Sequence, residues 1–162
     1  MIPYKVTKQY NWSYGKMKLS TKSRYGLRIL LQIALETETQ DSSRGKSIAE
    51  KQEITEAYLE QIMIPLKSSG IVKTIRGCHG GYVLNRATED ISVLDIIEIF
   101  EGKIQLVKCS DGNGKKCSRH DICMTTDVWE HLSEVLKTEA GKITLASLVE
   151  KSKINNKPVY VI

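Results

Sequence analysis

Apolar side chains recur at the spacing of a helix face between Ser23 and Glu36. The residues that form this stripe are Tyr25, Leu27, Leu30, Leu31, Ala34 and Leu35. Because neighbours on one face of an α-helix are three or four residues apart, the pattern predicts a first helix with one buried side. The polar stretch TETQDSSRGK that follows it predicts a loop.

Two shorter helices are predicted after this loop. The segment SIAE, which starts at Ser47, has the spacing of a capping box and would begin a short helix ending near Gln52 or Glu53. Thr55 is suited to cap a third helix, EAYLEQIMIPLKSSG, which Gly70 would close. Two helices joined by a tight turn are typical of a helix-turn-helix unit, whose second helix can enter a DNA groove.

The pattern then changes to short β-type runs, IVKTIRG and YVLNR, with the glycine-rich turn GCHGG between them. A basic hairpin after three helices predicts a winged helix-turn-helix domain, in which the hairpin is the wing. Ser92 next caps a short amphipathic helix, SVLDIIEIFEG, and a long helix from about Met124 to Ala140 precedes a last one, ITLASLVEKS. We expect a mostly α-helical fold with a small β-hairpin wing, and the long helix has little to bury against except a second subunit.

Charge is distributed unevenly along the 162 residues, whose net charge is +5. Residues 17–86 hold 11 basic and 7 acidic side chains, whereas residues 87–162 hold 10 basic and 12 acidic ones. This asymmetry favours a polyanionic partner for the N-terminal half, although chance scatter is an alternative. No apolar run approaches the ~20 residues of a membrane span. We expect a cytoplasmic protein with no membrane contact and no small-molecule substrate.

Three of the four cysteines, Cys109, Cys117 and Cys123, lie in one polar segment, KCSDGNGKKCSRHDIC. In a reducing compartment, clustered thiols bind metal or sense redox state more often than they form structural disulfides. Thiolates are the preferred ligands of iron–sulfur clusters. A zinc site, which usually has a closer cysteine pair, and a metal-free thiol sensor are the alternatives. The three histidines have no hydrolase or metalloprotease spacing, so we expect no enzyme.

Four segments together resemble a known family: MKLSTKSRYGLRILLQIAL, SIAEKQEITEAYLEQI, IRGCHGGYVL and TLASLVE. They resemble the iron–sulfur-regulator (Rrf-type) family of winged-helix transcription factors, which includes IscR, NsrR, RirA and CymR. The resemblance runs from Met17 to about Glu150. It implies a homodimer that binds palindromic operator DNA and is crossed by its long C-terminal helices. In several members an iron–sulfur cluster modulates operator binding, whereas CymR-like members lack the cysteine loop.

The resemblance implies that Cys109, Cys117 and Cys123 hold a 2Fe–2S or 4Fe–4S cluster that senses iron, redox or cluster status. Their seven-then-five spacing looks more like RirA than like IscR or NsrR. A metal-free regulator of cysteine or sulfur metabolism, controlled by its thiols or by a partner protein, is the alternative function.

The fourth cluster ligand does not carry over from the family. IscR-like members use a histidine at the position of Thr126 here, and NsrR-like members use an aspartate at the position of Arg24. His120, between the second and third cysteines, is the first candidate for a fourth ligand, and Asp121 and Asp127 are weaker ones. A solvated loop histidine is the competing interpretation of His120.

The predicted DNA contacts lie on three elements. They are Glu56, Ala57, Tyr58, Glu60 and Gln61 on the third helix, Lys73, Arg76, Gly77 and His79 on the wing, and Lys22 and Arg24 beside the first helix. Gln61 could pair with adenine and Glu60 could accept from cytosine, while Tyr58 could instead pack into the core. Arg76 matches the family residue that enters the minor groove.

These inferences divide the chain into four parts. Residues 1–16 would be an extension, either disordered or upstream of a natural start at Met17. Residues 17–102 would form the winged-helix DNA-binding domain, and residues 103–123 the cysteine loop. Residues 124–162 would form the dimerisation helix and the C-terminal tail.

Overall fold

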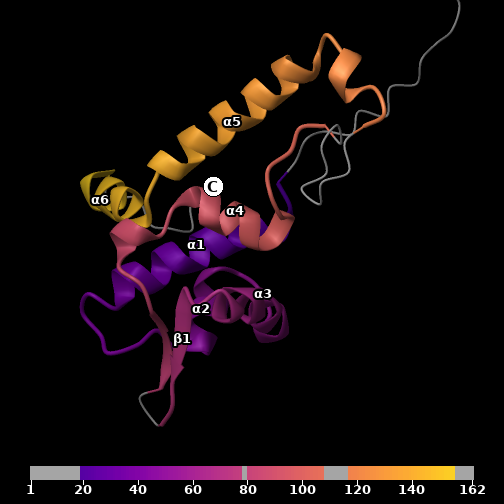
Figure 1. Ribbon diagram of the computed structural model, residues 1–162. Coiled ribbons are helices and arrows are strands. Elements are labelled where there is room, and N and C mark those ends of the chain that lie inside the picture. Colours follow the sequence, from indigo (N-terminus) through magenta and orange to yellow (C-terminus); the bar gives the residue numbers. More distant parts are fainter. Residues whose placement is uncertain (1–18, 78–79, 108–116, 156–162) are drawn as a thin grey trace, which may run out of the picture.

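The computed structural model describes residues 19–77, 80–107 and 117–155. Within these ranges the chain forms six α-helices and one antiparallel pair of strands, which confirms the predicted mostly helical winged fold. The elements are α1 Thr21–Glu36, α2 Gly45–Lys51, α3 Glu56–Ser68, β1 Val72–Ile75, β2 Gly81–Leu84, α4 Val93–Glu101, α5 Thr126–Lys142 and α6 Leu145–Asn155 (Figure 1). Short 3₁₀ turns at Thr88–Asp90 and His120–Ile122 precede α4 and α5.

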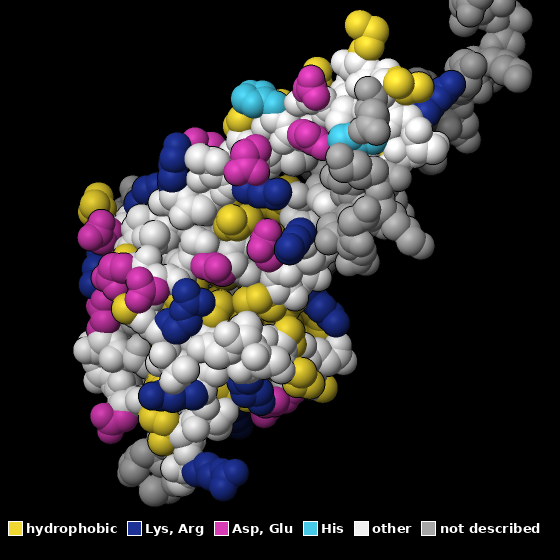
Figure 2. All heavy atoms as spheres, in the orientation of Figure 1, with side chains coloured by type: hydrophobic (Ala, Val, Ile, Leu, Met, Phe, Trp, Pro, Cys, Tyr) yellow, Lys and Arg dark blue, Asp and Glu magenta, His cyan; other side chains and the backbone are white. Residues whose placement is uncertain are grey.

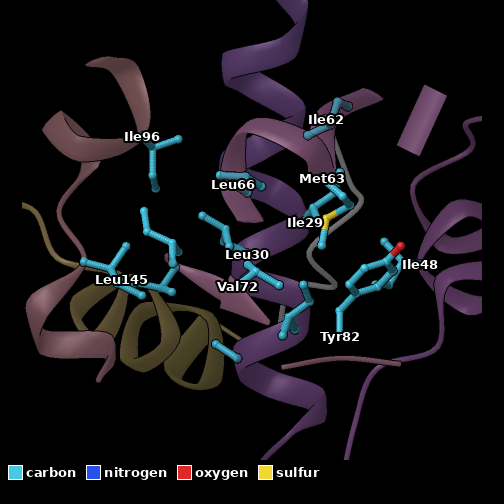
Figure 3. Close-up of a cluster of buried hydrophobic side chains, with 14 of the residues drawn as sticks. Ile29, Leu30, Ile48, Ile62, Met63, Leu66, Val72, Tyr82, Ile96 and Leu145 are labelled. Atoms are coloured by element: carbon cyan, nitrogen blue, oxygen red, sulfur yellow. The ribbon is translucent and has the colours of Figure 1, made fainter. Parts of the chain in front are cut away.

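Helix α1 lies at the centre of the molecule and is buried on two sides (Figure 3). Ile96 and Leu145 lie on one side of it, and Ile48 and Tyr82 lie on the other. The predicted single stripe on α1 is therefore wrong in part, because it omits Ile29 and Ile33, which are both fully buried. A helix packed between two layers buries a wider face than a surface helix does.

The helix-turn-helix unit consists of α2 and α3. The predicted cap of α3 is confirmed, because the Thr55 hydroxyl accepts a hydrogen bond from the Tyr58 backbone N–H at 3.2 Å. Gly70, just past the end of α3, has a φ of 74°, which suits glycine at the close of a helix.

The predicted capping box at Ser47 is wrong. Helix α2 begins two residues earlier, at Gly45, and Arg44 at its N-cap position makes no side-chain capping bond. The reason is tertiary. Ser43 pairs with Tyr82 of β2 as an isolated antiparallel bridge, so the chain is extended up to Arg44 and turns directly into α2.

The wing is formed by β1 and β2, which pair from Val72 opposite Leu84 to Ile75 opposite Gly81. The bridge from Ser43 adds a third, one-residue partner beside β2. This contact requires a glycine, because a Cβ at Gly81 would overlap the Ser43 carbonyl oxygen. The wing is thus bonded to the loop before α2 and not only to itself.

The C-terminal helices extend from the core and then return to it. Ser92 and Asp95 form the capping box of α4, which confirms Ser92 as the cap. Helix α5 begins and ends two residues later than predicted, and it runs from an N-terminal end that lies away from the compact part of the molecule back to α4 and α6 (Figure 1). Helix α6 returns to α1, and its Leu145 is fully buried in the common core. No helix in the described ranges is long and apolar enough to cross a membrane.

Candidate functional site

The polar side chains predicted to read DNA lie at the start of α3. Glu56, Ala57, Glu60 and Gln61 are all exposed there. Tyr58 is only half-buried and packs against the core cluster, so the alternative orientation considered for it is the one observed. The exposed first turns of α3 have the composition and position of a recognition helix.

The start of α1 lies beside the start of α3. The Tyr25 and Tyr58 rings meet edge to face, with centroids 5.9 Å apart. The Arg28 guanidinium lies over the Tyr25 ring at 5.1 Å, and such a cation–π contact stabilises the pair. Lys22 and Arg24 are exposed on the first turn of α1, so this packing brings two cations to the edge of the recognition surface.

Basic side chains also lie along the wing. Lys73, Arg76 and Gly77 are exposed on β1 and just after it, while His79 falls outside the described residues. In the face shown in Figure 2, Lys and Arg side chains lie beside the tip of the wing and over the neighbouring helices. The structure therefore places exposed cations on α1 and on the wing, two elements that both pack against α3.

A chain of polar contacts fixes α2 against α1 behind this surface. The buried Gln52 amide donates to Gln32 at 2.6 Å, and Gln32 donates to Glu36 at 2.9 Å. Lys51 pairs with Glu36 at 2.7 Å, and the Ser43 hydroxyl also donates to it. Burial alone would raise the pKa of Glu36, but these hydrogen bonds outweigh it and lower that pKa below its usual value.

Glu60 is held by the wing. The Tyr82 hydroxyl donates a hydrogen bond to one carboxylate oxygen of Glu60, and Lys67 lies 3.8 Å from the other. Tyr82 and Lys67 were not predicted as site residues from the sequence. The sequence signal that could have indicated Tyr82 is the GGY motif. Paired glycines are typical of a place where another backbone segment approaches closely, so the tyrosine that follows them is expected to lie at a packed contact.

The second candidate site is the segment before α5. Backbone bonds of the i to i+3 type join the His120 N–H to the Cys117 carbonyl at 2.9 Å and the Cys123 N–H to the His120 carbonyl at 3.4 Å. Cys117 and Cys123 therefore flank the 3₁₀ turn His120–Ile122, six residues apart, and backbone bonds tie each of them to His120. Cys109, the first predicted ligand, lies outside the described residues.

The Cys123 thiol is activated by the start of α5. Its sulfur lies 3.3 Å from the Thr125 hydroxyl oxygen. Hydrogen bonds from the Thr125 side chain and backbone, and from Thr126, lower the pKa of Cys123 to about 7. Cys117 is exposed, and neither thiol forms a disulfide with another described residue. Both are therefore accessible as soft ligands or as redox-active thiols.

His120 is engaged with α5. Its Nε2 atom lies 3.2 Å from a carboxylate oxygen of Glu130, and its side chain is 15% exposed. His120 is therefore not a freely solvated loop histidine, because its side chain is mostly covered and contacts Glu130. Within the described ranges, no three His, Cys, Asp or Glu side chains converge to hold a metal ion. The donor chemistry of Cys117 and Cys123 nevertheless suits an iron–sulfur cluster, for which Cys109 would be the third thiolate.

One face of α5 is apolar and incompletely covered. Its residues Val128, Trp129, Leu132, Val135 and Leu136 have exposed fractions of 37–52%. A cavity of about 410 Å³ lies between the end of α4, residues 103–106 and α5, and Leu136 lines it. A single chain leaves this amount of apolar surface in water only at a cost in free energy.

The helix-turn-helix unit, the wing and the flanking cations together define a DNA-binding protein of the winged-helix class. Residues 19–151 match the Rrf2 family, described as iron-dependent transcriptional regulator. The chain belongs to this family and is a DNA-binding transcriptional regulator, which is not an enzymatic class.

Relatives of known name agree with this assignment. The chain is 36% identical over 138 residues to protein rrf2 of Nitratidesulfovibrio vulgaris, which covers 85% of this chain and 91% of that protein. It is 34% identical to the regulator IscR of Klebsiella pneumoniae over 85% of this chain and 83% of IscR.

Two solved structures are similar. IscR of T. potens has a TM-score of 0.69 and 32% identity, covering 88% of this chain and 93% of its own. CymR, the global cysteine regulator of B. subtilis, has a TM-score of 0.66 and 34% identity, covering 83% and 98% of the two chains. The chain is thus similar both to an IscR and to a cysteine regulator.

Proposed function

We propose that this protein is a homodimeric regulator whose binding to palindromic operator DNA is controlled by an iron–sulfur cluster. Cys109, Cys117 and Cys123 would hold the cluster, of 2Fe–2S or 4Fe–4S type, and it would make DNA binding responsive to iron or redox state. The observation that carries the proposal is the presence of two free thiols, Cys117 and Cys123, in the short turn segment that leads directly into α5.

The residues around these thiols support a ligand role. His120 remains the candidate fourth ligand, and its contact with Glu130 would orient the ring as carboxylates orient ligating histidines in other metal sites. The low pKa of Cys123 favours the thiolate that a cluster requires.

The apolar face of α5 supports a homodimer. Two copies packed along this face would cover Val128, Leu132 and Val135, which a single chain leaves about half exposed. Leu132→Asp places a charge on the face and should yield monomers in multi-angle light scattering. Thr138→Asp places the same charge at an exposed position of α5 as the control. Equal masses for the two variants would contradict this dimer.

The wing supports a minor-groove contact by Arg76, which is exposed at the end of β1. The DNA is a duplex selected by the wild-type protein from a random-sequence pool. Arg76→Ala should weaken binding to this duplex by about 1–3 kcal/mol, measured by fluorescence anisotropy at fixed salt. Lys142→Ala, at the far end of α5, removes the same charge as the control. Unchanged affinity for Arg76→Ala would remove the minor-groove role.

The first test of the cluster is anaerobic purification followed by an absorbance spectrum and iron and sulfide analysis. We expect a brown protein with visible bands and matched iron and sulfide. Alanine at Cys109, Cys117 or Cys123 should each abolish the chromophore and leave the fold intact by circular dichroism. A colourless wild-type protein after anaerobic reconstitution would reject the proposal.

A second candidate function is favoured by the similarity to CymR of B. subtilis, whose name describes a cysteine regulator. In that case the thiols or a partner protein would control DNA binding without a metal. A colourless protein whose operator affinity changes on oxidation of Cys117 or Cys123 would support this function instead.

A further inference from the structure

The carboxylate of Glu60 is held at both of its oxygens although it lies on the exposed face of the recognition helix. Tyr82 donates its hydroxyl hydrogen to Oε1, and Lys67 pairs with Oε2 at 3.8 Å. The Lys67 ammonium also lies 5.8 Å from the centre of the Tyr82 ring. These three side chains come from α3 and β2, so they join the recognition helix to the wing.

Tyr82 is itself fixed in place. Its backbone N–H donates to the Ser43 carbonyl at 2.8 Å, and its carbonyl accepts from the Ser43 N–H at 2.9 Å. The residue is only 7% exposed, and its ring lies beside Ile48 (Figure 3). A ring held by the core and by two backbone bonds presents its hydroxyl in one direction.

A fixed donor limits the directions that Glu60 can take. An unrestrained glutamate on a helix surface samples several rotamers, and its charge repels DNA phosphates from each of them. Held by Tyr82 and Lys67, the carboxylate is partly neutralised and keeps one orientation. A carboxylate in one orientation can accept from a base amino group only at one place in the groove.

We infer that Tyr82 is a specificity-determining positioning residue, whose hydroxyl orients Glu60 and so sets which base pair the recognition helix accepts. Tyr82 need not contact DNA in this role. The inference rests on the DNA-binding class of the protein and not on the iron–sulfur cluster, so either proposal can fail without the other.

Burial and the neighbouring Glu60 carboxylate raise the pKa of Tyr82 far above its usual value. The hydroxyl therefore remains a donor wherever the protein is folded.

The test in DNA uses a duplex selected by the wild-type protein from a random-sequence pool, together with its single-base variants. Four proteins are compared at one salt concentration: wild type, Tyr82→Phe, Glu60→Ala and the double variant. Tyr82→Phe should reduce discrimination at one base pair by about fivefold to thirtyfold, the lower part of the range of one lost base contact, because Glu60 itself remains. In the Glu60→Ala background the same change should alter discrimination less than about twofold, because alanine offers the Tyr82 hydroxyl no acceptor.

Two results would overturn the inference. One is that Tyr82→Phe leaves the base preference unchanged at every position. The other is that it has the same effect with and without the Glu60 carboxylate.

Discussion

The winged-helix part of the molecule and the arm formed by residues 117–142 differ in how their apolar side chains are buried. In the first part, Ile29, Leu30, Ile62 and Met63 have no exposed surface. In the arm, every large apolar residue of the face of α5 is at least 37% exposed. The DNA-reading part therefore buries its apolar side chains within one chain, whereas the arm leaves an apolar face that one chain covers only in part.

The largest expected effect tests the self-sufficiency of the core. Leu30→Ala removes a fully buried side chain and should lower the free energy of unfolding by about 2–5 kcal/mol in urea titrations. Leu132→Ala removes the same atoms from the arm, where the residue is 42% exposed, and should cost less than about 1 kcal/mol within one chain. A larger loss for Leu132→Ala that depends on protein concentration would show that a second chain buries this side chain.

The next effect concerns the contact between α1 and α4. A Cβ at Gly26 would overlap the Phe100 ring, so Gly26→Ala should destabilise the winged-helix part by about 1–3 kcal/mol. The midpoint of thermal unfolding measures this loss. Gly26→Ala combined with Phe100→Leu should recover part of it, and no recovery would contradict the steric cause.

A third prediction concerns thiol chemistry in the arm of the metal-free protein. With a pKa of about 7, Cys123 is largely thiolate above pH 7, and its alkylation rate should fall about tenfold per pH unit below that value. Thr125→Val removes the hydroxyl bond, so the midpoint of the profile should move to higher pH. Iodoacetamide labelling read by peptide mass spectrometry separates Cys123 from the other cysteines. An identical midpoint in the two proteins would exclude Thr125 as the cause.

The smallest effect is a gain in stability. Gly141 lies within α5, and the nearest atom to an added Cβ is Leu94 Cδ2 at an ordinary 3.8 Å. Gly141→Ala should therefore stabilise the fold by about 0.5–1 kcal/mol through helix propensity. The midpoint of thermal unfolding measures both glycine-to-alanine variants. It should rise for Gly141→Ala and fall for Gly26→Ala. A loss at Gly141 would mean that this end of α5 is packed more tightly than a single chain shows.

Local signals predicted much of the fold. The Thr55 and Ser92 caps, Gly70 at the end of α3 and the glycine-rich hairpin all depend on residues within a few positions of one another. The start of α2 was predicted wrongly because it depends on a bridge to Tyr82, 39 residues beyond Ser43 in the chain.

The candidate site was likewise predictable where it depends on local patterns, and not where it depends on contacts between distant segments. Exposed charges on α3, the wing and α1 followed from composition and helical spacing. The bond from Tyr82 to Glu60 joins residues 22 apart in sequence, and only the packed wing brings them together. The half-buried position of Tyr58 likewise depends on Tyr25 of another helix. Contacts of this kind follow from packing and have no local pattern.

Because α6 packs on α1, the C-terminal end of α5 is held to the core, while its N-terminal end, within the described residues, is not. Two backbone hydrogen bonds fix this C-terminal end beside α4. The Val93 N–H donates to the Ile143 carbonyl and the Leu145 N–H donates to the Ile91 carbonyl, both at 2.8 Å. The 17 residues of α5 span about 26 Å, so a rotation of α5 by about 5° about its C-terminal end would move its N-terminal end, next to Cys123, by about 2 Å. A displacement at Cys123 would, in the same way, act on α4, and α4 packs directly on α1.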